Sequence, residues 1–308
     1  MLWQALGHRR HVTWAAEESQ GGIFMKTDRH RRAIRGALVA TAVAVATATV
    51  AGTASAAGAP APVAPSFHLY GIDKQTHELN EWIPTDAGRF TMEQPVPDDF
   101  SHIADIIPVD NNNNRDGEGE WTLHKNGQLD FFSFFGESPD TDTVGRGWNI
   151  YTTVLSPGSI GGAKEADLLG VDRTGVLYSY LAYPDGRLTT RTRVGGGWNA
   201  YTQIAGQGDL TGDGKADIVA RDRTGVLWLY KGTGDYKAPF GGRTKIGGGW
   251  NAYDRLLSTG DLDVDGKADL LARKPNGDLL RYSGTGNAAA PFKAPVKIGV
   301  GFQKYNLL

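Results

Sequence analysis

Two nine-residue acidic segments carry the side chains with the most obvious chemistry, and that chemistry is the binding of a hard cation. Residues 209–217 and 261–269 both read D-x-[DT]-x-D-G-x-x-D. Calcium takes six to eight oxygen ligands, and a tight loop presents such oxygens from alternate positions. Carboxylates packed this closely repel one another unless a cation neutralises them. The two segments therefore predict two Ca²⁺ sites.

The second segment offers more charge than the first. Its predicted ligands are the side chains of Asp261, Asp263, Asp265 and Asp269 and the carbonyl oxygen of Lys267. In the first segment they are Asp209, Asp213, Asp217, a weaker oxygen from Thr211, and Lys215. The alternative is a solvated acidic turn. It is less favoured because two copies of the segment occur in register. An EF-hand is excluded because the expected flanking elements are strands and position twelve is not glutamate.

The corresponding segments elsewhere are weaker. Oxygen-bearing side chains recur at Asn112, Asn114, Asp116, Glu118 and Glu120, with fewer charges, so we expect weak calcium binding or none. In a further copy Ser159, Gly161 and Ala163 replace the ligands and only Asp167 remains, so we expect no ion there.

These segments belong to a repeat of about fifty residues. Gly-Trp-Asn occurs at 147–149, 197–199 and 249–251, and Gly301-Phe302-Gln303 stands where the next copy belongs. Between these marks lie pairs of apolar runs that turn at Asn126-Gly127, Thr174-Gly175, Thr224-Gly225 and Asn276-Gly277. Asn-Gly between apolar runs is a strong hairpin signal. A period near fifty with about four strands per unit is typical of a β-propeller blade.

The two ends of the repeat region complement each other. The first copy, residues 67–99, lacks its leading strand, and residues 305–308 supply such a strand without the rest of a blade. We therefore predict an all-β fold, a five-bladed β-propeller closed by the C-terminal strand, because closure removes exposed sheet edges. The expected blades are 67–99 with 305–308, 100–150, 151–200, 201–252 and 253–304.

The first 66 residues are expected to lie outside the propeller. Residues 25–56 have a basic start, an Ala/Val-rich apolar run and the small-residue end Ala54-Ser55-Ala56, which are the three parts of a secretory signal. An uncleaved membrane anchor is the alternative. Residues 1–24 fit a misread upstream start, and residues 57–66 read as an Ala/Pro linker. We expect the protein to be secreted and extracellular.

Charge and composition exclude several functions. Residues 1–56 hold seven Lys/Arg and three Asp/Glu, so the remainder has a net charge of about −6 against −2 for the whole chain, without the basic stripe that nucleic acid needs. The chain has no cysteine, which rules out disulfides and thiolate metal sites. It has no G-x-S-x-G nucleophile elbow. The Gly-Lys pairs of the acidic segments lack the other residues of a P-loop, so a nucleotide is not expected.

Trp148, Trp198 and Trp250, each followed by an asparagine (Asn149, Asn199 and Asn251), are the candidate ligand-binding residues. Sugars stack on aromatic faces, and amides hydrogen-bond hydroxyl and acetamido groups. The alternative, favoured for the tryptophans, is that each Trp packs between blades while each Asn caps a turn.

Two family resemblances together cover roughly residues 67–308. The acidic segments resemble the calcium-binding FG-GAP/VCBS propeller repeats found in integrin α-chains, although five units replace seven. The units 195–201 and 247–253, Gly-Gly-Gly-Trp-Asn-Ala-Tyr, are similar to those of tachylectin-2-type lectins, five-bladed propellers that bind N-acetylated amino sugars. The resemblances imply a module that binds cell-surface glycans or another extracellular protein, and we expect it to be a monomer. A calcium-stabilised protein-interaction scaffold is the alternative, and a polysaccharide-active enzyme a more remote one, since we do not expect an enzyme.

Overall fold

The computed structural model describes residues 64–110, 117–134 and 141–308. The expected signal segment at 25–56, the upstream residues 1–24 and nearly all of the expected linker lie outside the described residues. Residues 62–308 form one compact unit. Within the described residues, no helix is long and apolar enough to cross a membrane.

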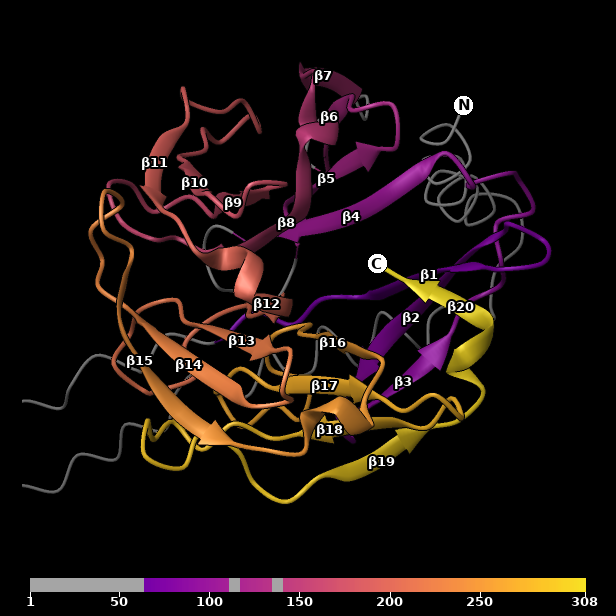
Figure 1. Ribbon diagram of the computed structural model, residues 1–308. Coiled ribbons are helices and arrows are strands. Elements are labelled where there is room, and N and C mark those ends of the chain that lie inside the picture. The colour runs from indigo at the N-terminus through magenta and orange to yellow at the C-terminus, as the bar shows by residue number, and fades with distance from the viewer. Residues whose placement is uncertain (1–63, 111–116, 135–140) are drawn as a thin grey trace, which may run out of the picture. The chain divides into compact units, whose positions relative to one another are not determined.

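The described chain forms five antiparallel sheets of four strands each, arranged in a ring (Figure 1). The first sheet holds β20 (Tyr305–Leu307), β1 (Leu69–Asp73), β2 (Leu79–Thr85) and β3 (Arg89–Met92), in that order. The second holds β4 (Ile103–Val109), β5 (Gly119–His124), β6 (Leu129–Ser133) and β7 (Thr141–Gly145). The third holds β8 (Tyr151–Gly158), β9 (Asp167–Asp172), β10 (Leu177–Tyr180) and β11 (Thr192–Gly195). The fourth holds β12 (Tyr201–Ala205), β13 (Ile218–Asp222), β14 (Leu227–Gly232) and β15 (Phe240–Gly247), and the fifth β16 (Arg255–Leu257), β17 (Leu270–Arg273), β18 (Leu279–Tyr282) and β19 (Val296–Gly299).

Ring closure occurs where the sequence predicts it. Strand β20 pairs antiparallel with β1, with Leu307 opposite Gly71 and Tyr305 opposite Asp73. Leu307 is buried in the same apolar cluster as Leu69 of blade one and Leu271 of blade five. The prediction of a five-bladed propeller closed by the C-terminal strand is confirmed.

At three of the junctions between blades, the third residue of a blade's third strand contacts the next blade. Phe131 of β6 packs against Gly186, where an added Cβ would clash with its ring. Ser179 of β10 donates to the carbonyl of Tyr236 at 3.2 Å. Arg281 of β18 donates to the carbonyl of Gly88 in blade one at 2.7 Å. The junction between blades five and one thus uses the same position as two junctions between consecutive blades.

Candidate functional site

The loop between β16 and β17 gathers three carboxylates in the fifth blade. Oxygen atoms of Asp261, Asp263 and Asp265 all lie within 4.8 Å of one another. Asp261 is fully buried, and the other two are partly buried. This spacing suits a hard cation that takes oxygen ligands, and it brings together three of the residues that the sequence singled out.

The backbone holds this loop in shape through Asp261 itself. Its carboxylate accepts hydrogen bonds from the backbone N–H groups of Asp265 at 3.1 Å and Gly266 at 2.8 Å. Gly266 has a φ of 84°, which glycine tolerates. The carbonyl of Lys267, another predicted ligand, follows in the same turn, whereas the predicted ligand Asp269 is not part of the group of three carboxylates. The side chain of Asp261, the first residue of the motif, therefore holds the loop backbone in a tight turn.

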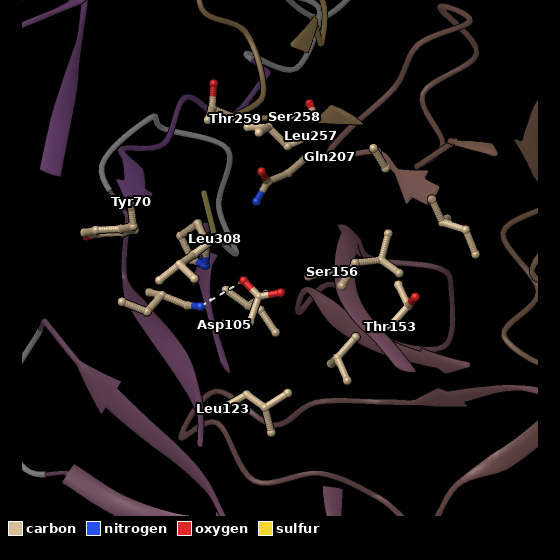
Figure 2. Close-up of a pocket in the computed structure, with 18 of the residues that line it drawn as sticks. Tyr70, Asp105, Leu123, Thr153, Ser156, Gln207, Leu257, Ser258, Thr259 and Leu308 are labelled. Carbon is tan, nitrogen blue, oxygen red and sulfur yellow. Dashed lines mark hydrogen bonds between the residues drawn. The ribbon is translucent and has the colours of Figure 1, made fainter. Parts of the chain in front are cut away.

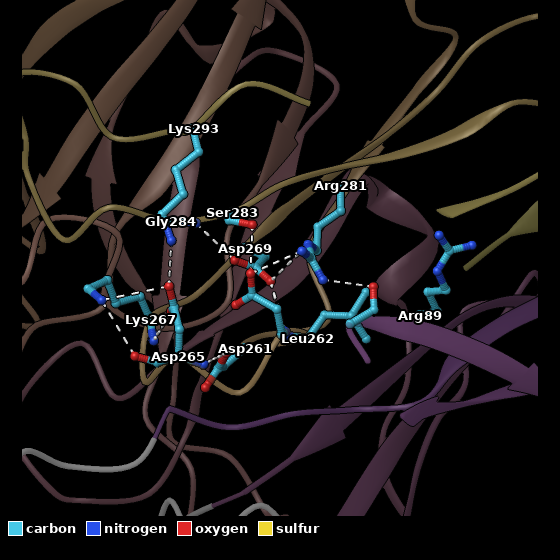
Figure 3. Close-up of polar contacts among 12 residues, drawn as sticks. Arg89, Asp261, Leu262, Asp265, Lys267, Asp269, Arg281, Ser283, Gly284 and Lys293 are labelled. Atoms are coloured by element: carbon cyan, nitrogen blue, oxygen red, sulfur yellow. Dashed lines mark hydrogen bonds and ion pairs between the residues drawn. The ribbon is translucent and has the colours of Figure 1, made fainter. Parts of the chain in front are cut away.

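Basic side chains surround the same carboxylates (Figure 3). Lys293 Nζ lies 2.8 Å from Asp265 Oδ2, and Lys267 Nζ lies 3.7 Å from the same oxygen. Arg281 Nη2 lies 3.1 Å from Asp263 Oδ2. These contacts neutralise part of the negative charge, so a bound cation would compete with Lys293 and Lys267 for Asp265.

The loop between β12 and β13 has the same internal frame. Asp209 accepts hydrogen bonds from the N–H groups of Thr211 at 2.9 Å, Gly212 at 2.7 Å and Gly214 at 2.6 Å. Asp213 accepts one from Lys215 N–H at 3.1 Å and pairs with Lys231 Nζ at 3.1 Å. The Thr211 hydroxyl takes the place of one carboxylate, so this loop carries less charge.

The final aspartate of each loop is buried and joins two parts of its blade. Asp269 accepts from Leu262 N–H at 3.1 Å and from Gly284 N–H at 2.9 Å. Asp217 makes the equivalent bonds to Leu210 and Gly232. Desolvation raises the pKa of Asp269 to about 7 and that of Asp217 to about 6.

Asp167 shows that this joining role is independent of the other carboxylates. It accepts from Ile160 N–H at 2.9 Å and Ala182 N–H at 3.0 Å, the same pattern as in the acidic loops. Burial raises its pKa to about 7, and the neighbouring Glu165 adds to the shift. The position therefore has a structural use in all three blades, which the motif alone did not reveal.

The weaker predicted site in blade two is only partly described. Asn112, Asn114 and Asp116 lie outside the described residues. Glu118 is half-buried at the start of the segment that leads into β5. Glu120 is 2% exposed, and its carboxylate accepts a hydrogen bond from the Tyr70 hydroxyl of blade one at 3.1 Å.

The tryptophans of the Gly-Trp-Asn units lie in the core. Trp148, Trp198 and Trp250 are 6%, 8% and 8% exposed. Each packs against two tyrosines; Trp198, for example, lies 5.7 Å from Tyr201 and 4.8 Å from Tyr230 between ring centroids. These rings lack the open face on which a sugar could stack.

The asparagines are exposed and lie over hairpin turns. A Cβ added at Gly175 would come within 2.6 Å of Asn199, and Gly127 and Gly225 meet Asn149 and Asn251 in the same way. The adjoining Trp198 N–H donates to the Gly175 carbonyl at 2.9 Å. The hairpin glycine and the Gly-Trp-Asn unit recur together because one packs on the other. A cavity of about 200 Å³ adjoins Asn199 and Arg173.

A larger cavity of about 250 Å³ lies where the first strands of the blades converge (Figure 2). Asp105 of β4 is in its wall, next to the N–H of Ile106, which donates to Asp105 Oδ1 at 3.0 Å. Burial raises the pKa of Asp105 to about 6, and the positive charge of Arg255 opposes this rise. Protein atoms enclose the Asp105 carboxylate, and water reaches this carboxylate through the cavity.

Comparison with known families singles out the two acidic loops. Residues 209–272 match the FG-GAP-like repeat family. This FG-GAP-like segment begins at Asp209 and ends inside β17, so it contains both loops. Comparison with curated proteins gives no match.

Comparison with solved structures gives matches of low sequence identity, with TM-scores below 0.5. The BP39L lectin from Burkholderia pseudomallei is 14% identical, with a TM-score of 0.43 over 78% of this chain and 72% of that chain. The Nup133 β-propeller domain from Vanderwaltozyma polyspora is 11% identical, with a TM-score of 0.37 over 76% and 74%. A putative 6-phosphogluconolactonase from Bacteroides fragilis is 13% identical, with a TM-score of 0.36 over 73% and 66%.

The FG-GAP-like segment accounts for the strong loops but not for the central cavity. Sequence reasoning missed Asp105, Gln207, Arg255 and Thr259, which line that cavity. Gln207 and Thr259 each stand two residues before the first aspartate of an acidic loop, which is the one signal that could have marked them. Asp105 and Arg255 belong to no repeated motif.

Proposed function

We propose that this protein is a secreted calcium-binding β-propeller that acts as a carbohydrate-binding or adhesion module. The observation that carries the calcium part is the clustering of the Asp261, Asp263 and Asp265 oxygens within 4.8 Å in an FG-GAP-like segment. Three carboxylates supply charge, and the turn adds neutral oxygens of the kind that calcium accepts. Bound calcium would hold the loop closed and neutralise it.

Thermal unfolding with and without a chelator tests the calcium proposal. Calcium at a hundredfold excess over its Kd should stabilise the fold by about 2.7 kcal/mol for each site that binds only the folded state. Asp265→Ala should lose much of this gain. Asp142→Ala, which removes an exposed aspartate on β7, is the matched control and should respond like the wild type. Identical melting temperatures with calcium and with chelator in the wild type would refute the proposal.

The carbohydrate proposal draws support from exposed polar groups beside cavities. Asn199 and Arg173 adjoin a cavity of about 200 Å³, and amide and guanidinium groups hydrogen-bond sugar hydroxyls. A glycan array probed with the calcium-loaded protein, and again with chelator present, is the test. We expect binding to a restricted set of glycans; an array without any signal in both conditions would contradict it.

Burial of the tryptophans favours a second candidate, a calcium-stabilised protein-interaction scaffold. Trp148, Trp198 and Trp250 offer no open ring face, so the commonest sugar-stacking device is missing at the positions expected to carry it. A calcium-dependent rise in melting temperature together with a blank glycan array is the result that this candidate predicts.

Secretion is part of the same proposal and has its own test. Mass spectrometry of the protein recovered from culture medium should show an N-terminus at Ala57, directly after the small-residue cleavage pattern. Recovery of the full-length chain from the membrane fraction would instead indicate an uncleaved anchor.

A further inference from the structure

The cavity of about 250 Å³ receives residues from the first strands of all five blades or from their flanks. In blade one the innermost strand β20 pairs only with residues 71–73 of β1. His68 and Tyr70, just before that paired stretch, are therefore part of the wall as well. With roughly 30 Å³ per molecule of liquid water, the cavity has room for about eight waters or one sugar ring.

Several polar groups in the wall have no partner in the described part of the chain. Thr259 is 4% exposed, and its hydroxyl oxygen is buried without a hydrogen bond. The Nε atom of Arg255 is also buried without a hydrogen bond. Gln207 is 7% exposed, and its amide points into the cavity without a side-chain hydrogen bond among the described residues (Figure 2). Protein atoms cover the Thr259 hydroxyl and the Arg255 Nε, whereas the Gln207 amide faces the cavity, where a ligand or ordered water can supply the partner that a buried polar group normally has.

The two charges in the wall are of opposite sign but do not form a pair. Among the described residues, neither a hydrogen bond nor an ion pair joins Asp105 to Arg255, although the two are close enough to interact through space. The guanidinium disfavours a bare metal cation, and the carboxylate disfavours a bare anion. A neutral molecule with several hydroxyl groups satisfies both, because a hydroxyl donates to carboxylate and accepts from guanidinium.

Two tyrosine residues are also part of the wall, and neighbours hold their rings in place. The Tyr70 hydroxyl donates to Glu120 at 3.1 Å, and the Tyr151 hydroxyl shares a hydrogen bond with that of Tyr180. Both residues are among those that line the cavity. Aromatic carbon beside amide, guanidinium and carboxylate groups is the chemical combination that binds a sugar ring.

We propose that the central cavity binds one neutral monosaccharide unit, such as the terminal residue of a glycan. Asp105, Gln207 and Arg255 hydrogen-bond its hydroxyls, and Tyr70 and Tyr151 contribute apolar surface to the wall. This inference rests on the proposed carbohydrate function and deepens it, since it places the sugar in the middle of the ring and not at the Gly-Trp-Asn units.

Saturation-transfer NMR with a panel of methyl glycosides of the common neutral hexoses and N-acetylhexosamines tests the inference on the calcium-loaded, secreted chain. Titration of the best-bound glycoside then gives its Kd for wild type, Arg255→Met and Gln207→Leu. We expect each variant to weaken binding by roughly ten-fold or more, because a ligand hydroxyl loses its buried partner. Asp105→Asn, which changes shape least, is the third cavity variant and guards against loss of folding.

Asp142→Ala, which removes an exposed aspartate of β7, is the matched control and should leave the Kd unchanged, whereas Asn199→Ala alters the other candidate cavity. Circular dichroism and melting temperature show whether each variant is folded. A glycoside bound equally well by all three cavity variants would overturn the inference while the carbohydrate function stands, most clearly if Asn199→Ala abolished binding. Absence of binding to every glycoside and every arrayed glycan would overturn both.

Discussion

At the scale of single residues, the two acidic loops differ at one strained position. Val264 has a φ of 63°, which is unfavourable for a β-branched residue, whereas Gly212 stands at the corresponding position of the first loop with a φ of 79°. Val264 is 42% exposed, so its side chain contributes little burial. The sequence motif allows any residue at this position. The backbone favours glycine there, because the φ angle is positive.

Val264→Gly should therefore stabilise the protein. Relief of the left-handed strain, worth about 1–2 kcal/mol, exceeds the entropy cost of glycine, for a net gain of roughly 0.5–1 kcal/mol. Gly212→Val is the reverse control and should destabilise, because its Cβ would lie 2.5 Å from the Gly286 carbonyl oxygen. Urea denaturation measures both; a loss of stability in Val264→Gly would contradict this account of the loop.

Asp167 gives a pH dependence that is separate from the acidic loops. Its pKa is about 7 in the folded state, against an ordinary value of 3.8, and desolvation is the main cause of the rise. Between pH 4 and 7 the folded state holds the proton and the unfolded state does not, so its contribution to stability falls as pH rises, by up to about 4 kcal/mol.

Asp167→Asn should reduce the fall in unfolding free energy between pH 5 and pH 8, measured by denaturant titration with chelator present, and leave the part that the raised pKa values of Asp217 and Asp269 cause. Asp142→Asn, at an exposed site, should keep the wild-type slope. If Asp167→Asn and the wild type lose the same free energy over this range, Asp167 is not the group that titrates.

At the scale of elements, the hairpin turn and the Gly-Trp-Asn unit act as one packed pair. Gly175 has a φ of 82°, and any Cβ there would meet Asn199 at 2.6 Å. Gly196, by contrast, has no positive φ, and the nearest neighbour of an added Cβ lies at 3.7 Å. The two features recur together in each of these blades because they touch in space, although their separation in the sequence grows from 22 residues (Gly127 to Asn149) to 26 (Gly225 to Asn251).

Gly175→Ala should cost roughly 1–3 kcal/mol of stability, through left-handed strain and the clash with Asn199. Gly196→Ala is the matched control and should be nearly neutral. Adding Asn199→Gly to Gly175→Ala should restore the part due to the clash. Equal unfolding free energies for the two alanine variants would contradict the packing that links turn and unit.

The elements were more predictable from the sequence than the cavity. Period-fifty spacing and turn residues such as Asn276-Gly277 have local causes, so the hairpins and the two acidic loops could be predicted directly. The pairing of β20 with β1 followed from two incomplete ends. The central cavity could not be predicted, because Asp105, Gln207 and Arg255 come from three blades and meet only through ring geometry. Packing of the tryptophans between blades was the favoured expectation from the sequence, whereas the particular partner of Trp198, Tyr230, depends on strand register.

At the scale of the whole molecule, the ring depends on the strand that closes it. Three residues of β20 pair with β1, and Leu307 is 6% exposed in the cluster that joins blades one and five. Without this strand the inner edge of β1 would be open to other chains.

Removal of residues 305–308 should therefore lower the melting temperature strongly and cause association. Light scattering after size-exclusion chromatography, combined with thermal unfolding, checks both effects. Removal of Leu308 alone, which leaves β20 in place, is the control and should have a small effect. A truncated chain that stays monomeric and melts like the wild type would show that the ring does not need β20.

The number of calcium ions bound per chain decides whether the two acidic loops are metal sites. Isothermal titration of the secreted chain with Ca²⁺ should show two strong sites, one for each acidic loop of the FG-GAP-like segment. Asp265→Ala should remove one site and leave the other, and Asp142→Ala should keep both. Absence of any calcium binding by the folded wild-type protein at millimolar concentrations would contradict the account.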